Sequence, residues 1–292
     1  MSVIVTPPIF LIFLFIALLI AAYRDVKTRE VPDSLNYCLI VIGLLGSLII
    51  ALENSDLSFF LEHLAGFGIG FAVGMAMFYG RQWGGGDAKL IMGVGAILGF
   101  SYANLQLPEF LILLVLCGAL YGVLFTLYLA LVKHRRTFLP AFKQHLRTPI
   151  VHRLRITLVC SVLVLLAVAI FVSWPARVII GFLMVSLYLL VYSWIFMNAV
   201  ERNILIREYP VGKLTEGDWV AQEVKVGKNV IITAKNTGIT LEQIAQIRKS
   251  KIKKVIVKEG IAFVPSFFLA FIVLLLLHAI FGSGWQVRFF FS

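Results

Sequence analysis

The chain has 292 residues, of which 60% are hydrophobic and 14% are charged. A soluble globular domain carries roughly 45–50% apolar and about 25% charged residues, so this composition excludes a soluble protein and indicates an integral membrane protein. The formal net charge of +11 is weak support for nucleic-acid binding, because excess Lys and Arg also orient membrane proteins.

Eight apolar segments approach the length that a helix needs to cross about 30 Å of hydrocarbon, which is about 17–25 residues. The fourth is the weakest because it is short and rich in glycine. The sixth and seventh are separated only by Ser173-Trp174-Pro175, which predicts a tight helical hairpin or, alternatively, one long broken helix. The segments lie at about 8–23, 35–52, 59–79, 88–103, 108–132, 155–173, 176–197 and 261–281.

The distribution of positive charge predicts the orientation of these segments. Cytoplasmic loops are enriched in Lys and Arg, and alternate connections of this chain hold 24 of its 26 Lys and Arg residues. The first segment has no Lys or Arg before it, which favours a retained helix over a cleaved signal peptide. Both termini are therefore expected outside, and the basic loops in the cytoplasm, at 24–34, 80–89, 133–155 and 198–260.

The stretch 198–260 is polar, basic and punctuated by glycine. Val224–Val226, Val230–Thr233 and Lys253–Lys258 read as short strands, and a capping-box pattern at Thr240 predicts a helix through about Arg248. The predicted fold class is therefore an all-α polytopic membrane protein of about 6–8 transmembrane helices with a small cytoplasmic α/β module. We expect a transmembrane catalytic domain at 1–197, the module at 198–260, and the last transmembrane helix and tail at 261–292.

Two acidic residues stand out because they lie at the cytoplasmic ends of membrane segments. Asp25 ends the first segment and Asp87 begins the fourth, so the predicted topology places both on the same side at similar depth. Ionisable groups at membrane depth are costly and indicate function. Two carboxylates that approach closely share a proton, as in the aspartic proteases, where one activates water and the other polarises the scissile carbonyl.

The roles of the two aspartates can be weighed from helix dipoles. The dipole at a helix N-terminus favours the ionised form of Asp87, and the dipole at a helix C-terminus disfavours the ionised form of Asp25. The dipoles therefore point to Asp87 as the base, although the positive charges of Arg24 and Lys27 favour the ionised form of Asp25. For either residue alone, an interfacial ion pair or a helix cap is the competing interpretation. Gly84-Gly85-Gly86 precedes Asp87 and permits close backbone approach and positive φ, which suits a substrate strand or, alternatively, a flexible turn.

Metal and cofactor chemistry is not expected. The three cysteines form no C-x-x-C pair, so neither a structural zinc site nor a disulfide framework is predicted. The histidines of the basic loop are irregularly spaced, and His278 has no spaced partner. Gly66, Gly70 and Gly74, like Gly95 and Gly99, lie four residues apart and predict close packing of the third and fourth segments.

These residues resemble a known family. Asp25 followed by Val31-Pro32-Asp33-Ser34-Leu35 resembles the first motif of the type IV prepilin and preflagellin peptidases, and Gly84-Gly85-Gly86-Asp87-Ala88-Lys89-Leu90 resembles their second, G-x-G-D followed by x-Lys-Leu. The resemblance covers about residues 8–132. The polar module and the last apolar segment are similar to the C-terminal extension of archaeal members.

The resemblance implies an intramembrane aspartic endopeptidase of the cytoplasmic membrane. Such enzymes remove class III signal peptides from prepilin and preflagellin precursors at the cytoplasmic face, so the implied partners are these precursors and membrane lipids, without nucleic acid or cofactor. It implies Asp25 and Asp87 as catalytic residues and Gly84, Gly85, Gly86 and Lys89 as the active-site loop. N-methyltransferase activity, found in bacterial members with paired cysteines, is not expected here.

Acidic residues near Asp25 are candidates for substrate binding. The implied substrates carry Lys or Arg ahead of the cleavage site, so the nearby acidic residues Glu30 and Asp33 are expected to bind substrate. Alternatively, they pair with Arg29 or Lys27 and only shape the loop.

The rival function is a proton- or cation-coupled transporter that uses the membrane carboxylates. It does not account for two carboxylates at one face rather than at the midplane.

Overall fold

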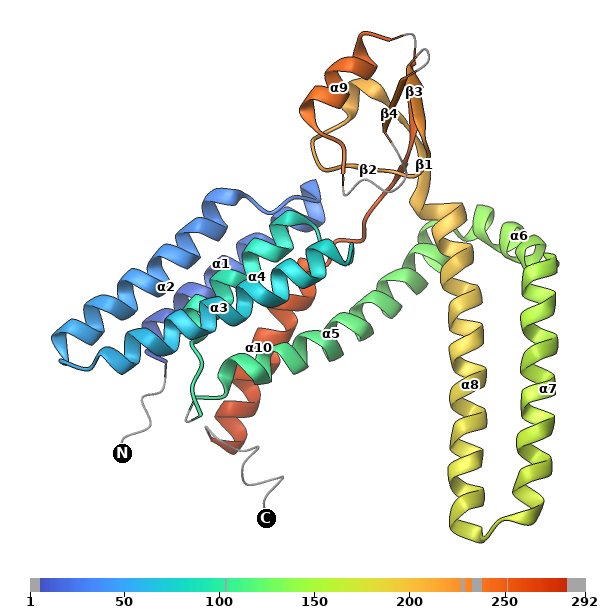
Figure 1. Cartoon of the computed structure of the whole chain (residues 1–292), viewed down its shortest axis with the longest axis horizontal. Coiled ribbons are helices and arrows are strands. Elements are labelled where there is room, and N and C mark those ends of the chain that lie inside the picture. The colour runs from blue at the N-terminus through green and yellow to red at the C-terminus, as the bar shows by residue number, and fades with distance from the viewer. Residues whose placement is uncertain (1–5, 103, 227–228, 233–237, 251, 283–292) are drawn as a thin grey trace. The chain divides into compact units, whose positions relative to one another are not determined.

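The computed structural model describes residues 6–102, 104–226, 229–232, 238–250 and 252–282, which form two compact units (Figure 1). The first unit comprises Met1–Val123, Thr237–Thr240 and Gly260–Ser292, and the second comprises Leu124–Asn236 and Leu241–Glu259.

Among the described residues, seven helices are long and apolar enough to cross a membrane, which confirms the predicted class of a polytopic, mostly helical protein. They coincide with seven of the eight predicted segments. The prediction of a fourth spanning segment at 88–103 is wrong. There the structure has a helix of only 14 residues, α4 (Gly85–Leu98), which extends about 21 Å and is too short to cross the hydrocarbon alone. The seven are Pro8–Thr28, Asp33–Glu53, Leu57–Tyr79, Gln106–Lys133, Pro149–Phe171, Trp174–Leu205 and Val264–Phe281.

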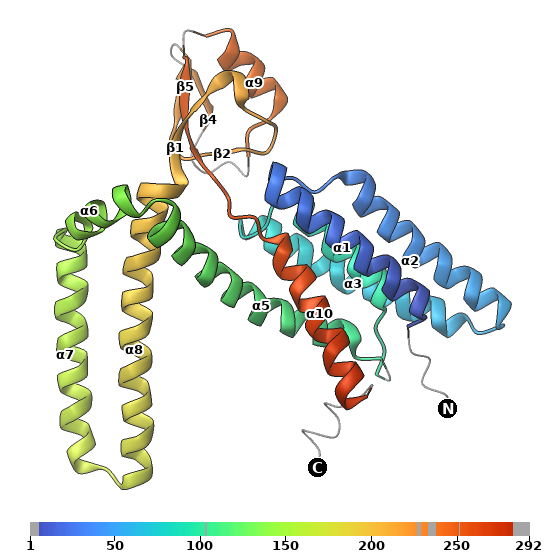
Figure 2. The same ribbon diagram turned by 180° about the vertical axis from the view of Figure 1, so that it is seen from behind.

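The first unit is built around α4. Helices α2 (Asp33–Glu53) and α3 (Leu57–Tyr79) pack on α4, and α1 (Pro8–Thr28) contacts α4 and α10 (Val264–Phe281). Figure 2 shows α1 and α10 side by side. The residues of α4 from Leu90 to Leu98 are almost all buried. A membrane helix enclosed by its neighbours can be short, since non-helical backbone at membrane depth is tolerated where protein covers it.

The predicted glycine packing of α3 against α4 is confirmed. A Cβ atom on Gly66 would lie 2.3 Å from the carbonyl oxygen of Gly95, and one on Gly95 would lie 2.2 Å from that of Gly66. Gly70 and Gly74 similarly face the backbone of α4 at Ile91 and Ala88. The two helices therefore approach as closely as their backbones permit, which is the role of small residues in membrane interfaces.

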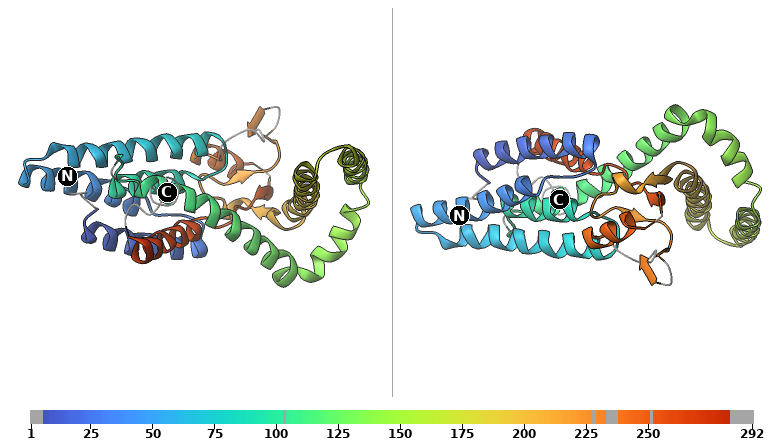
Figure 3. Two further views of the ribbon diagram at one scale, coloured as in Figure 1. Left: turned by 90° about the horizontal axis from the view of Figure 1, so that it is seen from below. Right: turned by 90° about the horizontal axis from the view of Figure 1, so that it is seen from above.

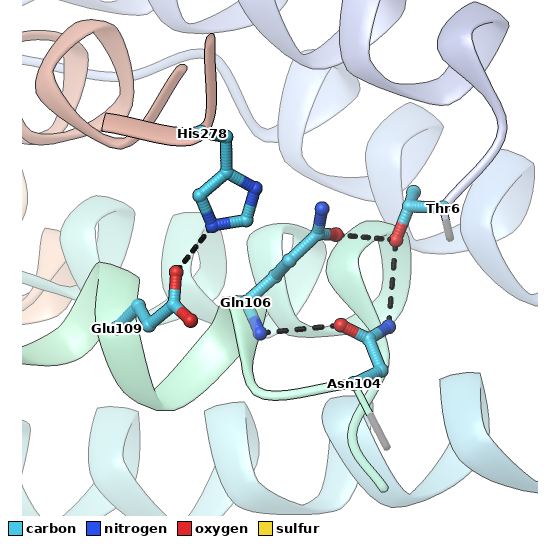
Figure 4. A network of polar contacts seen from close by, with 5 residues as sticks. All are labelled: Thr6, Asn104, Gln106, Glu109 and His278. Carbon is cyan, nitrogen blue, oxygen red and sulfur yellow. Dashed lines mark hydrogen bonds and ion pairs between the residues drawn. The ribbon is translucent and has the colours of Figure 1, made fainter. Parts of the chain in front are cut away.

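A buried polar network closes the C-terminal end of α4 (Figure 4). The Leu98 carbonyl accepts from Asn104 Nδ2 at 2.9 Å and lies 3.1 Å from the Thr6 hydroxyl. Asn104 Oδ1 in turn accepts from the backbone N–H of Gln106 at the start of α5 (Gln106–Tyr128). These contacts supply hydrogen-bond donors and acceptors where the helix ends inside protein, which explains how α4 stops short.

The same end of the unit contains a polar contact between α5 and α10. His278 Nε2 contacts Glu109 Oε2, and the Glu109 side chain is buried (Figure 4). The sequence spacing indicated no partner for His278, because Glu109 lies 169 residues away. The pair therefore corrects that interpretation, and it links α10 to α5 at the end opposite to the N-terminus of α10.

The second unit contains a helical hairpin. Helices α7 (Pro149–Phe171) and α8 (Trp174–Val200) pack side by side (Figure 3). Val172 has extended backbone angles and Pro175 lies in the first turn of α8, so the hairpin and not the broken helix is the correct alternative. The polar connection before α7 forms helix α6 (Arg135–His145), which buries Phe138 against α8 while its Arg and Lys side chains are exposed.

The α/β module of this unit contains the strands predicted from sequence. They are β3 (Val224–Val226), β4 (Asn229–Ile232) and β5 (Lys254–Lys258), with α9 at Leu241–Arg248; Thr233 lies outside the described residues. Two strands were not predicted, β1 (Ile206–Pro210) and β2 (Trp219–Val220). They flank β5 in an antiparallel sheet of order β1-β5-β2, and β3 pairs with β4.

Candidate active site

Asp25 lies in the last turn of α1, where its side chain is buried. Its Oδ2 accepts a hydrogen bond from the backbone N–H of Val264, at 2.9 Å, in the first turn of α10. The positive charge of Arg29 also acts on this carboxylate. Burial of Asp25 opposes its ionisation, whereas Arg29 and the N-terminus of α10, with its unpaired N–H groups and positive dipole end, favour the ionised form.

Asp87 lies in the first turn of α4, outside the seven spanning helices. Its Oδ2 accepts from the backbone N–H of Gly84 at 3.1 Å. Burial and the negative charge of Asp25 raise the pKa of Asp87 to about 7, against the opposite effect of the Gly84 hydrogen bond. The structure therefore brings the two sequence-predicted aspartates within electrostatic reach of each other.

An aromatic cluster joins the loop before Asp87 to the helix that contacts Asp25. Trp83 is buried, and its ring centroid lies 5.9 Å from that of Phe263 and 5.4 Å from that of Phe267. Gly118 of α5 leaves room for Phe263, since a Cβ there would lie 2.8 Å from the ring. The start of α10 is thus fixed against both aspartate-bearing segments.

The glycine loop differs in part from its predicted conformation. Gly84 is extended, and Gly85 and Gly86 already belong to α4, so none of them adopts a positive φ. Gly84 and Gly85 are exposed, and Cβ atoms on them would meet nothing closer than 3.6 Å. Gly86 is packed more closely, because its Cβ would lie 3.3 Å from Val31. The loop therefore leaves open backbone beside Asp87, which a substrate strand can approach.

Asp33 has a different environment from the one expected of a substrate-binding residue. Its two carboxylate oxygens lie 2.7 and 2.8 Å from Lys89 Nζ, and Lys89 also lies over the Tyr37 ring at 5.4 Å. The carboxylate is thus paired with Lys89, a partner that neither the substrate-binding prediction nor its alternative had named. Glu30 is exposed, and its carboxylate remains the candidate for contact with a basic substrate.

Sequence reasoning missed three contributors to this site: Val264, Trp83 and Asn36. Val264 acts through its backbone, which leaves no signal in the side chain. Trp83 was visible directly before the glycines, but nothing in its spacing pointed to α10. Asn36 is fully buried, and its Nδ2 donates to the carbonyl of Gly86 at 3.2 Å; a lone Asn in an apolar segment was the one available signal.

Part of the chain is similar to proteins of a known family. Residues 12–127 match the model of the Type IV leader peptidase family. The matched segment includes both aspartates, the glycine loop, Glu30 and Asp33, and it ends before the helical hairpin, the α/β module and α10. The predicted resemblance to prepilin and preflagellin peptidases is confirmed.

Relatives of known name agree with this match. The chain is 32% identical over 119 residues to a preflagellin peptidase of Methanocaldococcus jannaschii, covering 37% of this chain and 50% of that protein. It is 31% identical over 125 residues to a preflagellin peptidase of Methanococcus voltae, covering 39% and 53%. The chain thus spans about half the length of these relatives. No solved structure matches it.

Proposed function

We propose that this protein is an intramembrane aspartic endopeptidase that removes class III signal peptides from prepilin- or preflagellin-like precursors. The observation that carries the proposal is the pairing of Asp25 and Asp87, in which the charge of one raises the pKa of the other. Two such carboxyl groups share one proton, and a proton-sharing pair supplies both the acid and the base that peptide hydrolysis needs.

We assign the roles of the two aspartates from their contacts. We take Asp25 as the ionised base, because the backbone N–H at the start of α10 donates to its carboxylate. It takes a proton from water as the water attacks the scissile carbonyl. Asp87 is the protonated partner below about pH 7, and its proton polarises the carbonyl oxygen. This reverses the assignment favoured by the sequence, since the dipole of α10 at Asp25 was not visible there.

The proposal also includes the membrane and the orientation of the protein in it. Seven apolar helices indicate a multi-pass membrane protein. We place it in the cytoplasmic membrane with the aspartates and basic loops facing the cytoplasm, as the Lys and Arg distribution predicts. Its partners are then the precursors and the surrounding lipids, and nucleic acid has no role. A transporter is the less favoured function, because the matched family and named relatives are peptidases.

Cleavage by the purified protein tests the proposal directly. The full chain, reconstituted in liposomes, is incubated with a preflagellin and separately with a type IV prepilin, and the new N-terminus is sequenced. Cleavage on the cytoplasmic side of the hydrophobic stretch supports the proposal. Ion flux across the same liposomes without cleavage of either precursor would favour the transporter.

The pKa of Asp87 predicts the pH dependence of cleavage. Because its pKa is raised to about 7, Asp87 keeps its proton below that pH and loses it above. We therefore expect kcat/KM to fall as pH rises through about 7, and to fall again at acid pH when Asp25 becomes protonated. The measurement is a kcat/KM profile between pH 4 and 9, and equal values at pH 6 and 9 would contradict the assignment.

Glu30 predicts a charge-dependent KM. Glu30 is exposed beside the α1–α2 connection, and an exposed ion pair contributes about 0–1 kcal/mol. Glu30→Gln should therefore raise KM for a basic precursor by up to about fivefold at low salt, and less at high salt. The control is the same precursor with its Lys and Arg residues ahead of the cleavage site replaced by Gln. An equal rise in KM for both precursors would overturn a direct contact.

A further inference from the structure

Asn36 is a buried polar residue with an incomplete set of hydrogen bonds. It lies in the first turn of α2 and is fully buried. Its Nδ2 donates to the Gly86 carbonyl at 3.2 Å, whereas its Oδ1 is buried without a hydrogen-bond partner in the part of the chain that the structure describes. A buried acceptor left unpaired destabilises a protein, so the amide needs an explanation other than stability.

The Gly86 carbonyl does not depend on Asn36 for a partner. Gly86 is the second residue of α4, so helix geometry directs its carbonyl at the N–H of Leu90, one turn along the chain. The contact from Asn36 is therefore an additional one. An apolar side chain of similar volume at position 36 would remove the unpaired oxygen and leave the helical hydrogen bond in place.

The Gly86 carbonyl has a direct geometric link to Asp87. The carbonyl of one residue and the N–H of the next lie in one rigid peptide plane, so the orientation of the Gly86 carbonyl sets the direction in which the Asp87 backbone begins. Val31 packs on Gly86 from the same connection, and Asp33 binds Lys89 two residues beyond Asp87. Val31, Asp33 and Asn36, at and just before the start of α2, thus contact α4 on both sides of Asp87.

From this placement, and assuming the proposed function, we propose that Asn36 is a positioning residue for cleavage: its amide fixes the Gly86–Asp87 peptide plane and thereby holds the Asp87 carboxyl in register with Asp25. Asn36 does not touch substrate in this proposal. It acts through Asp87, so its loss should affect turnover and leave substrate affinity nearly unchanged.

The chain offers a matched control at the other end of α4. Asn104 is also buried, and its Nδ2 donates to a backbone carbonyl of α4, that of Leu98, at 2.9 Å. Unlike Asn36, it has a partner for its Oδ1, the N–H of Gln106. The two residues make the same kind of contact with the same helix, and only Asn36 lies beside an aspartate of the site.

The experiment compares Asn36→Leu with Asn104→Leu in the full chain, reconstituted in liposomes, against the same precursor. We expect Asn36→Leu to lower kcat by about tenfold to a hundredfold, as misplacement of a catalytic group does, with KM changed less than about threefold. Its Tm should be unchanged or higher, because an unpaired buried oxygen is removed. Asn104→Leu should lower Tm and leave kcat per folded molecule unchanged. Should Asn36→Leu fail to insert, Asn36→Ala and Asn104→Ala serve for the same comparison of kcat.

Two outcomes would overturn the inference. One is a lower Tm with unchanged kcat for Asn36→Leu, which would make the residue structural. The other is an equal loss of kcat in both Leu variants.

A readout without substrate separates this inference from the proposed function. The protonated carboxyl of Asp87 absorbs in the infrared, and its band is identified as the one lost in Asp87→Asn. Asn36→Leu should shift the pH at which this band disappears, whereas Asn104→Leu should not. A shift in a protein that cleaves no precursor would refute the peptidase function and retain the positioning role. An unshifted band in an active enzyme would refute the positioning role alone.

Discussion

Asp25→Asn and Asp87→Asn should each reduce precursor cleavage by about a thousandfold or more, since removal of one member of a catalytic unit costs nearly as much as removal of all. Asp25→Asn removes the base that takes the proton from water. Asp87→Asn removes the acidic proton and keeps an amide of the same shape, whose N–H cannot replace a carboxylic acid as proton donor. Single-turnover cleavage with excess enzyme measures both losses.

The control for this pair is Asp56→Asn. Asp56 is also an aspartate that caps a helix, and its side chain accepts from the N–H of Ser58 at the start of α3. Asn serves as an N-cap about as well as Asp, so this variant should insert and cleave normally. Cleavage within about tenfold of wild type by Asp25→Asn or Asp87→Asn, with insertion intact, would contradict the aspartic mechanism.

The sequence was sufficient for the features that depend on local pattern. Hydropathy placed seven spanning helices, and the four-residue glycine spacing identified the α3–α4 contact, because each pattern directly reflects burial or backbone approach. Topology alone predicted Asp25 and Asp87 at the same face and at similar depth. The short strand β2 was missed because its two residues, Trp219 and Val220, present no alternation.

The features that the sequence did not reveal depend on contacts between distant segments. Val264 donates to Asp25 across 239 positions, and this contact is the reason for which we propose Asp25, and not Asp87, as the base. Asp33 likewise faces Lys89, 56 positions away, and not its near neighbours in the chain. Arg29 and Lys27, which are nearer in the chain, were the alternative partners that the sequence offered, and the packing of α2 on α4 brings the more distant lysine close.

A second large effect is expected at the glycines that hold α4 in place. Gly66 and Gly68 both lie in α3, but a Cβ on Gly66 would meet the Gly95 carbonyl oxygen at 2.3 Å, whereas a Cβ on Gly68 would meet nothing within 4 Å. Replacement of Gly by Ala in a helix interior stabilises by about 1 kcal/mol where space permits, so Gly68→Ala should keep or raise Tm.

Gly66→Ala makes the same chemical change where space is lacking. The new methyl group meets backbone that cannot rotate away, so α3 and α4 must separate, at a cost of about 1–3 kcal/mol or more. We expect its Tm to fall below that of Gly68→Ala, and cleavage to fall with it because α4 carries Asp87. Thermal unfolding of both variants in the same detergent measures the difference. Equal Tm values would show that α3 and α4 do not depend on this contact, and the close packing would then no longer explain how Asp87 is held beside Asp25.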